Sequence, residues 1–587
     1  MSLFRKYSEI WNHFEEVGRQ EAKCKYCKSI LSCKSQSNLS RHLKSKHPAS
    51  MEPVIRQNTD GPIFVQSAQP KITSFAERPV PASKAQHIDL QLVRMIAKGH
   101  HALRLVEAPE FKKFIHDVSH TPNYKLPTRK TLTSSLIPKI RDEYTGTIIE
   151  ELRAATAVCL TTDGWTSITN ESYLAVTVHF IDEESTMLTY TIACQAFEAS
   201  HTAANLCSFL EKIVTEWDLK NKVAAIASDN AHNIALAIRT GNWSHIRCFA
   251  HTLNLIVQKA LDKISSVRRK AKAISEYFHR SSSGLKKLKD MQALLKLADL
   301  KLTQDVPTRW NSTYKMFERL SILKEAVVAA LSTRTDLILS LEDWDVIDGV
   351  LPVLKPFYEV TEEISAEKNL TLSKIIALTG LLQRKMAQIY PTFKNNLVAE
   401  VINEIINEMD GRFNDFEANI LYAESTVLDP RFKGRAFKSA EAFKKSVADI
   451  NKKLAQTIRS LTEPPQEAIS NKKQEEDTIW AEFDTTFQQV SQPTNNTAAS
   501  IREMDKYLAE EYISRKDDPL VWWNQRNAQY PLLYNYMLKR LCLVATSVPC
   551  ERIFSSAGET IRKRRSLLKS TTVENLIFCI TTCKSER

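Results

Sequence analysis

Glycine is scarce in this 587-residue sequence, which holds 12 glycines, about 2% against about 7% in average proteins. The two closest, Gly146 and Gly164, are 164 − 146 = 18 positions apart. Phosphate-binding loops such as GxGxxG, GxxxxGKS and the kinase glycine loop need several glycines within a few residues. The sequence therefore excludes these loops, and we expect no nucleotide cofactor.

Long apolar runs are also missing, because no stretch approaches the roughly 18 apolar residues that span a bilayer. The first residues, MSLFRKYSEIWNHF, lack the apolar centre of a signal peptide. The 11 cysteines are scattered apart from Cys24, Cys27 and Cys33, which argues against a disulfide framework. We expect an intracellular protein in a reducing compartment, without a membrane partner.

Basic residues exceed acidic ones, with 80 Lys and Arg against 68 Asp and Glu, a net charge of +12 and a pI near 9.0. This balance favours a polyanionic partner, although a basic soluble protein without such a partner can have the same composition. At roughly 100–200 residues per domain, the length predicts three to five folding units.

The chain divides by composition into segments of different character. Six prolines between Pro48 and Ala85 indicate a flexible linker after a small N-terminal unit. Beyond about residue 256, apolar residues at helical spacing with almost no glycine indicate mostly helix. The expected segments are 1–50, 51–85, 86–150, 151–260, 261–515 and 516–587.

A mixed α/β pattern occupies the fourth segment. Three β-rich runs, TAVCLTTD, SYLAVTVHFID and TMLTYTIACQAF, precede alternating helix and strand patterns. We expect a sheet covered by helices. Asp163 ends the first strand and Asp229 ends the fourth, so parallel neighbouring strands would bring both carboxylates to one sheet edge. Turn or helix-cap roles are the alternative for each aspartate taken alone.

The N-terminal unit contains four residues at the spacing of a zinc site. Cys24-x2-Cys27 is followed, after fourteen residues, by His42-x4-His47. Two thiolates and two imidazoles form the closed tetrahedral set that structural Zn²⁺ prefers, and the metal would supply much of the stability of so small a unit. Coincidental surface groups are the alternative. Cations beside these ligands suit DNA, or form a solvated face: Lys34, Arg41, Lys44 and Lys46.

A third acidic residue lies far along the chain, in TSVPCERIFSSAGETIRKRR. Ser547 can cap a helix that runs to about Ala557, and Glu551 would flank its apolar stripe. Together with Asp163 and Asp229, it would complete a set of hard oxygen donors that suits Mg²⁺ or Mn²⁺. An exposed, solvated glutamate is the alternative.

Two resemblances to known families follow from these motifs. Trp11, Phe14, KCKYC and SNLSRHLKSKH resemble a BED-type zinc finger, a DNA-binding module. TTDGWTS, SDNAHN, CFAHTLNL, TRWNSTY and VPCERIFSSAGETIRKRR occur in the order typical of the hAT superfamily of DNA transposases. That resemblance implies a ribonuclease-H-like core interrupted by a helical insertion. The segments it implies are a helical DNA-binding and oligomerisation segment (86–150), the insertion (261–515) and the dimerisation region with the end of the core (516–587).

The hAT resemblance also implies roles for particular residues. Asp163, Asp229 and Glu551 match the family's catalytic DDE triad, at separations of 229 − 163 = 66 and 551 − 229 = 322 positions. Arg309 and Trp310 match a DNA-contacting pair whose Trp stacks beside a flipped base, with core packing of Trp310 as the alternative.

Further motifs have roles that remain open. Cys248-x2-His251 matches the family's CxxH motif and supports the active site or DNA contacts, or is a structural cap. A basic run is expected to contact DNA phosphates and could double as a nuclear import signal, or be a solvated face: Arg562, Lys563, Arg564 and Arg565. WWNQRNAQYPLLYNYMLKRLCLVA resembles the apolar dimerisation surface, unless it packs inside one subunit.

These resemblances imply a nuclear cut-and-paste transposase. It would act on double-stranded DNA, at transposon ends and target, as a homodimer or higher oligomer. It would cleave with hairpin formation on flanking DNA and then transfer the strands to target DNA. A domesticated transposase that regulates transcription without catalysis is the main alternative, and a ribonuclease-H-like nuclease unrelated to mobile elements is a third.

Overall fold

The computed structural model describes residues 9–18, 20–33, 36–48, 80–118, 123–366, 370–393, 396–462, 496–561 and 568–582. The chain forms two compact units, Met1–Arg78 and Pro79–Arg587. No helix within the described ranges is both long enough and apolar enough to cross a membrane. Most of the predicted linker lies outside the described residues, but its last four residues belong to helix α2 (Ala82–Lys98).

The N-terminal unit is a small sheet with one helix. Strands β1 (Phe14–Gly18), β2 (Glu21–Cys24) and β3 (Ile30–Ser32) pair antiparallel in sequence order, and α1 (Gln36–Lys46) follows. The buried core consists of five side chains, Phe14, Ala22, Cys24, Leu39 and Leu43. So small a core provides little hydrophobic stabilisation, which agrees with the predicted need for a structural metal.

The second unit is built around a five-stranded mixed sheet, as the sequence pattern predicts. Strands β4 (Val158–Thr166), β5 (Ser172–Ile181) and β6 (Met187–Ala196) form an antiparallel meander. Strands β7 (Val223–Ser228) and β8 (His245–Arg247) join it in parallel, so the strand order is β6-β5-β4-β7-β8. The first and fourth strands are thus parallel neighbours, which is the condition under which Asp163 and Asp229 reach one sheet edge.

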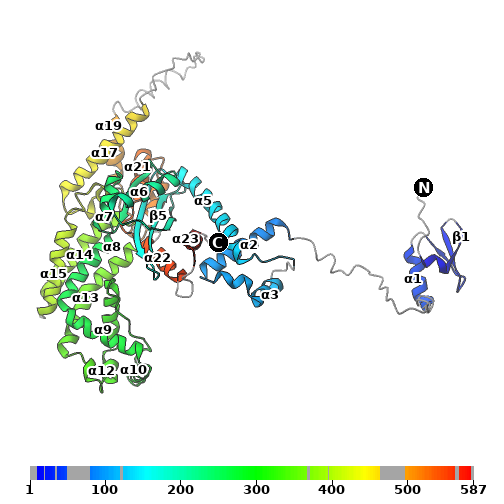
Figure 1. The fold of residues 1–587 in the computed structure, drawn as a ribbon. Helices are drawn as coiled ribbons and strands as arrows, with labels where there is room; N and C mark the ends of the chain where they lie inside the picture. Colours follow the sequence, from blue (N-terminus) through cyan, green and yellow to red (C-terminus); the bar gives the residue numbers. More distant parts are fainter. Residues whose placement is uncertain are drawn as a thin grey trace, which may run out of the picture. The chain divides into compact units, whose positions relative to one another are not determined.

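Helices cover both faces of this sheet because side chains alternate between the faces along each strand. One face packs Val158, Leu160 and Val176 against three helices, which are α5 (Ile137–Ala154), α6 (Ala203–Glu216) and α7 (His232–Thr240). The opposite face packs Cys159 against α8 (Phe249–Leu261) and Ala175 against α22 (Val548–Thr560). Figure 1 shows α22 beside β5, although hundreds of residues separate them in sequence.

A large helical region separates α8 from α22. Its longer helices are α9 (Ser265–Arg280), α10 (Ser282–Leu294), α11 (Trp310–Ile322), α12 (Lys324–Ala330), α13 (Leu341–Ile364), α14 (Ile375–Ile389), α15 (Asn396–Phe413), α16 (Ile420–Val427), α17 (Ala440–Thr462), α19 (Asn496–Ala509), α20 (Pro519–Asn524) and α21 (Pro531–Leu541). Side chains from these helices share one continuous core with α8. The predicted helical insertion is therefore present.

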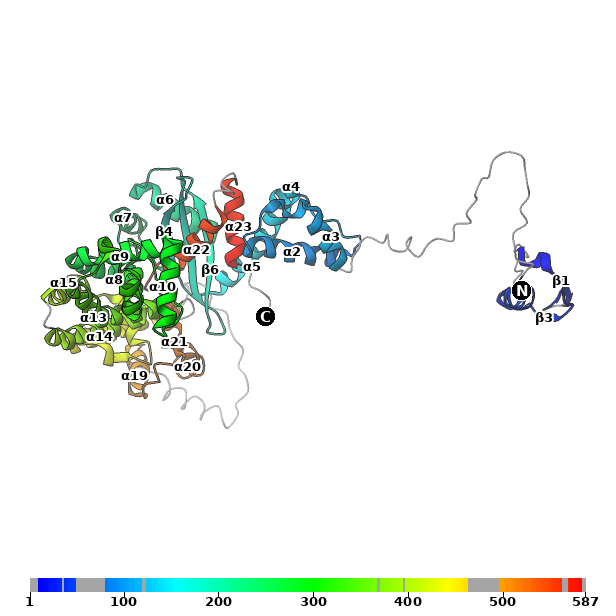
Figure 2. The ribbon, with the colours of Figure 1, turned by 90° about the horizontal axis from the view of Figure 1, so that it is seen from below.

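The C-terminal helix α23 (Ser570–Thr582) joins the core to the helices that precede it. It packs against β6, α2 and α5. Figure 2 shows the red α23 beside the blue α2 and α5. Two further helices complete this region, α3 (Pro109–Val118) and α4 (Arg129–Thr131). The first and last parts of this unit are thus packed together.

Candidate active site and metal centre

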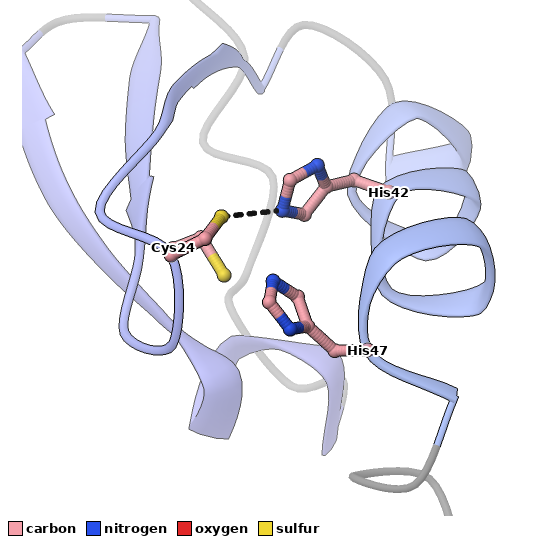
Figure 3. A group of neighbouring side chains, drawn as sticks. Cys24, His42 and His47 are labelled. Carbon is pink, nitrogen blue, oxygen red and sulfur yellow. Dashed lines mark hydrogen bonds between the residues drawn. The ribbon is translucent and has the colours of Figure 1, made fainter.

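The four predicted zinc ligands come together in the N-terminal unit. The ligand atoms of Cys24, Cys27, His42 and His47 all lie within 4.8 Å of one another. Cys24 ends β2, Cys27 lies in the following turn, and the histidines lie on and just after α1. Figure 3 shows Cys24 facing both imidazoles. The predicted cations Arg41 and Lys44 are exposed on the same helix.

The chemistry of this donor set fits zinc. Cys27 Sγ lies 3.2 Å from His42 Nε2. Hydrogen bonds with Ser29 and His47 lower the pKa of the Cys27 thiol to about 5, so it is held ready as a thiolate. Two sulfurs and two imidazole nitrogens at this spacing match a structural Zn²⁺ site.

The two predicted aspartates meet at one edge of the central sheet. The parallel register pairs Thr161 with Ala227, and Asp163 and Asp229 each follow two residues later. The Gly164 N–H donates to Asp163 Oδ1 at 2.8 Å, and the Ala231 N–H donates to Asp229 Oδ1 at 3.2 Å. Both aspartates line one cavity of about 290 Å³. The backbone therefore orients both carboxylates toward a shared space.

Helix α22 brings Glu551 to the same edge. The predicted apolar stripe of this helix, Cys550, Ile553, Phe554 and Ala557, is buried against β4 and β5. Cys550 Sγ lies 3.2 Å from Thr161 Oγ1, two residues before Asp163. Glu551 and Asp163 line one open cavity of about 790 Å³. The helix differs in detail from its prediction, because the Ser547 side chain makes no cap hydrogen bond and the helix continues past Gly558 to Thr560.

The three carboxylates influence one another electrostatically. Burial, opposed by the Gly164 N–H and assisted by the negative charges of Asp229 and Glu551, raises the pKa of Asp163 to about 7. In the described part of the chain, groups of three or more potential ligand atoms within 4.8 Å occur only in the finger. The ligand atoms of the three acids are therefore not all within 4.8 Å of one another, unlike those of the finger.

Arg309 neutralises part of this charge. Its guanidinium donates to Glu551 Oε2 at 3.3 Å, and the two side chains are 67% and 41% exposed. The three carboxylates offer oxygen donors whose negative charges repel one another. A divalent cation bound between such donors relieves this repulsion. The residues present therefore fit Mg²⁺ or Mn²⁺.

Trp310 lies in the hydrophobic core in this structure. It begins α11 and is 2% exposed, although its edge lines the cavity beside Glu551. Its backbone N–H donates to Asn254 Oδ1 at 3.2 Å. The packing alternative therefore describes this conformation, and stacking on a base would require the side chain to be uncovered.

Cys248 and His251 differ in role. Cys248 is fully buried, its pKa is raised by that burial, and its Sγ accepts from the Ser547 N–H at 3.4 Å. The next residue, Phe249, donates its N–H to the Ala545 carbonyl at 2.8 Å. Cys248 thus anchors the segment that leads into α22, whereas His251 lines the cavity.

Other cavity residues were not singled out by the sequence analysis. Trp165 follows Asp163 by two positions, and its ring stacks on Phe554 with centroids 5.9 Å apart. Asn254 also lines the cavity. Both residues lie inside motifs that the sequence reveals, TTDGWTS and CFAHTLNL, but a motif does not show which member faces a cavity.

The remaining two predictions concern the basic run and the aromatic segment near the C-terminus. Arg562, Arg564 and Arg565 lie outside the described residues. Most aromatic side chains of 522–537 are buried within the subunit, Trp523 and Tyr530 completely, whereas Tyr534 is only partly buried. The completely buried rings thus pack inside one subunit, and they do so within the predicted dimerisation region.

Comparisons with known protein families agree with this architecture. Residues 8–48 match the BED zinc finger, and 503–581 match the hAT family C-terminal dimerisation region. Residues 161–240 match the ZBED1 RNase-like domain, and 246–352 match the ZBED1 RNase-like helical domain. The matches together describe a BED finger, a ribonuclease-like core with its helical domain, and a dimerisation region.

Individual relatives are similar along nearly the whole chain. Over 98% of its length it is 24% identical to zinc finger BED domain-containing protein 4 of Homo sapiens and to a candidate AC transposase of Zea mays. These matches cover 51% and 73% of the relatives, so the chain spans about half the length of the human protein. The chain therefore carries a BED zinc finger and the hAT family's C-terminal dimerisation region.

Proposed function

We propose that this chain is a cut-and-paste DNA transposase whose catalytic carboxylates are Asp163, Asp229 and Glu551. The observation that supports this most strongly is geometric: Asp163 lines one cavity together with Asp229 and a second cavity together with Glu551. A protein that only binds DNA has no need of three acidic groups, from three distant segments, that line two cavities sharing Asp163.

The three acids would hold Mg²⁺ or Mn²⁺. Bound there, such ions would activate an attacking oxygen and stabilise a leaving oxygen at phosphorus. Basic residues of the chain would position the DNA. Arg309 carries a positive charge at the mouth of the cavity, suited to a phosphate near the acids. Arg41 and Lys44 on the finger helix would contact the DNA ends.

The proposed reaction cleaves DNA at the element's ends, forms hairpins on the flanking DNA and joins the ends to target DNA. It would take place in the nucleus and in a dimer or higher oligomer, and it requires no covalent link between protein and DNA. Base flipping during hairpin formation would involve Arg309 and Trp310, provided that Trp310 leaves its packed position.

A cleavage assay with candidate DNA ends and Mg²⁺ or Mn²⁺ tests the proposal. Asp229→Asn should abolish cleavage and leave DNA binding intact, because the finger lies in a separate unit. Asp290→Asn, which changes an exposed aspartate of α10, is the matched control and should cleave normally. Full cleavage by Asp229→Asn would dismiss the triad.

A second function is supported by the Arg309–Glu551 ion pair. A regulator that binds DNA without catalysis could keep Glu551 permanently neutralised by Arg309. A relative from Talaromyces stipitatus, 24% identical, is named as a transcriptional regulator. The same assay separates the two functions, because a regulator would bind DNA through its finger and cleave no DNA with any metal.

A further inference from the structure

The connection between α10 and α11 ends at the cavity lined by Asp163 and Glu551, which we call the acidic cavity. Residues 302–309, which we call the strap, contain no helix or strand and place Arg309 next to Glu551. A free connection of this kind would let its last residue sample many positions. Here the strap is instead fixed by side chains from three helices.

The first anchor is Asp305 in the middle of the strap. Its carboxylate is 3% exposed and accepts from Arg268 of α9 at 3.3 and 3.4 Å. The same carboxylate accepts the hydroxyls of Thr313 at 2.7 Å and Ser312 at 3.2 Å, both on α11. A buried carboxylate is costly unless it is paired and hydrogen-bonded, and these partners satisfy it.

The second anchor comes from α8. Asn254 Oδ1 accepts the Trp310 N–H, and Gln258 Nε2 donates to the Pro307 carbonyl at 2.9 Å. Arg268 Nη1 also donates to Gln258 Oε1 at 2.8 Å, so both anchors belong to one connected network.

The same helix α8 also fixes the other side of the cavity. At its N-terminal end, Cys248 and Phe249 hold the segment before α22, which carries Glu551. Three residues on from His251, Asn254 holds the start of α11. Because α8 anchors both segments, it fixes the Arg309 strap relative to the Glu551 helix.

We propose that Asp305 is a positioning residue that, together with Asn254, sets Arg309 at the mouth of the acidic cavity. Its effect on strap geometry is independent of any reaction, whereas its effect on DNA chemistry rests on the proposed function. Asp305 does not face the cavity and contacts no acid of the triad, so it acts through Arg309.

A structural role alone is the competing explanation, and the chain offers a matched control for it. Asp343 in the first turn of α13 is also largely buried and also pairs with a cation of α9, Lys270, at 2.7 Å. Asp343→Ala therefore removes a similar ion pair from the same helix without touching the strap.

Hydrogen exchange of the zinc-loaded, full-length protein tests the geometry. Asp305→Ala should raise exchange of the 306–310 amides at least about tenfold while the β4–β5 amides stay protected. Asp343→Ala should leave the strap amides unchanged. Asp305→Asn keeps an acceptor for Thr313 but loses the charge, so it should give a smaller increase and serves if the alanine variant does not fold. Unchanged strap exchange in Asp305→Asn would overturn the proposal.

The second readout is the balance between strand nicking and hairpin formation on DNA ends. Asp305→Asn and Arg309→Ala should lower the hairpin-to-nick ratio to a similar extent, at least about fivefold, while Asp343→Ala keeps the wild-type ratio. If Asp305→Asn raises strap exchange but keeps the wild-type hairpin-to-nick ratio, Asp305 has no role in DNA chemistry. If the wild-type protein cleaves no DNA, the proposed function fails, and the exchange result still decides the geometry.

Discussion

The finger and the acidic cavity gather ligands in opposite ways. The four finger ligands lie within 47 − 24 = 23 positions of one another and already stand within 4.8 Å. The three acids span 551 − 163 = 388 positions and remain further apart. The finger depends on its metal to fold, whereas the cavity is held in place by a large hydrophobic core whether or not a metal binds.

Zinc removal is the largest expected effect and tests the first half of this comparison. Structural zinc contributes about 10–16 kcal/mol of apparent binding free energy in finger peptides. Treatment with a zinc chelator should therefore expose the amides of 9–48 to rapid hydrogen exchange and leave the β4–β5 amides protected. Continued protection of the finger would contradict its dependence on metal.

Truncation of Phe554 tests the second half. This ring is largely buried, packs on Trp165 and seats α22 on the sheet. Phe554→Ala should lower the free energy of unfolding of the second unit by about 3–5 kcal/mol, measured by denaturant titration. Exposed Phe114 of α3 provides the control, since Phe114→Ala should change the free energy of unfolding by less than about 0.5 kcal/mol. Equal effects would argue against the packing described for α22.

Binding of Mn²⁺ should stabilise the second unit only moderately. At a free concentration 100 times its dissociation constant, a ligand adds about 2.7 kcal/mol to the free energy of unfolding. The wild-type protein should show this gain in a thermal melt, and Asp163→Asn should lose most of it. An equal gain in both proteins would mean that the metal binds elsewhere.

Loss of the Arg309–Glu551 ion pair should have the smallest effect on stability. Both side chains are substantially exposed, so solvent screens their attraction, and Arg309→Ala should change the free energy of unfolding by less than about 1 kcal/mol. A larger loss in denaturant titration would show that the pair supports the fold rather than only the cavity.

The sequence predicts the finger almost completely because its ligands are close in sequence and their spacing is characteristic. It also predicts the strands and the positions of Asp163 and Asp229 at their ends, since these are local signals. That the two strands are parallel neighbours is only a condition at that stage, and the structure meets it. The helix of Glu551 is predicted, but its place on the sheet rests on the family resemblance. No local pattern determines which surface a distant helix covers.

Other features depend on tertiary packing and could not be predicted. For Trp310 the sequence leaves base stacking and core packing open, and the choice between them depends on how the start of α11 is held against α8. Asp305 lies outside the motifs named in the sequence analysis, and its burial becomes visible only once α9 and α11 surround it. Contacts between segments that are distant in sequence produce no characteristic residue spacing from which they could be predicted.

The central claim is that Asp163, Asp229 and Glu551 bind shared divalent cations. Electron paramagnetic resonance titration of Mn²⁺ into the zinc-loaded protein tests it directly, with wild type compared with Asp163→Asn, Asp229→Asn and Glu551→Gln. The account predicts that each substitution weakens Mn²⁺ binding by about tenfold or more. Wild-type affinity in Glu551→Gln would contradict it, because the third acid would then take no part in the site.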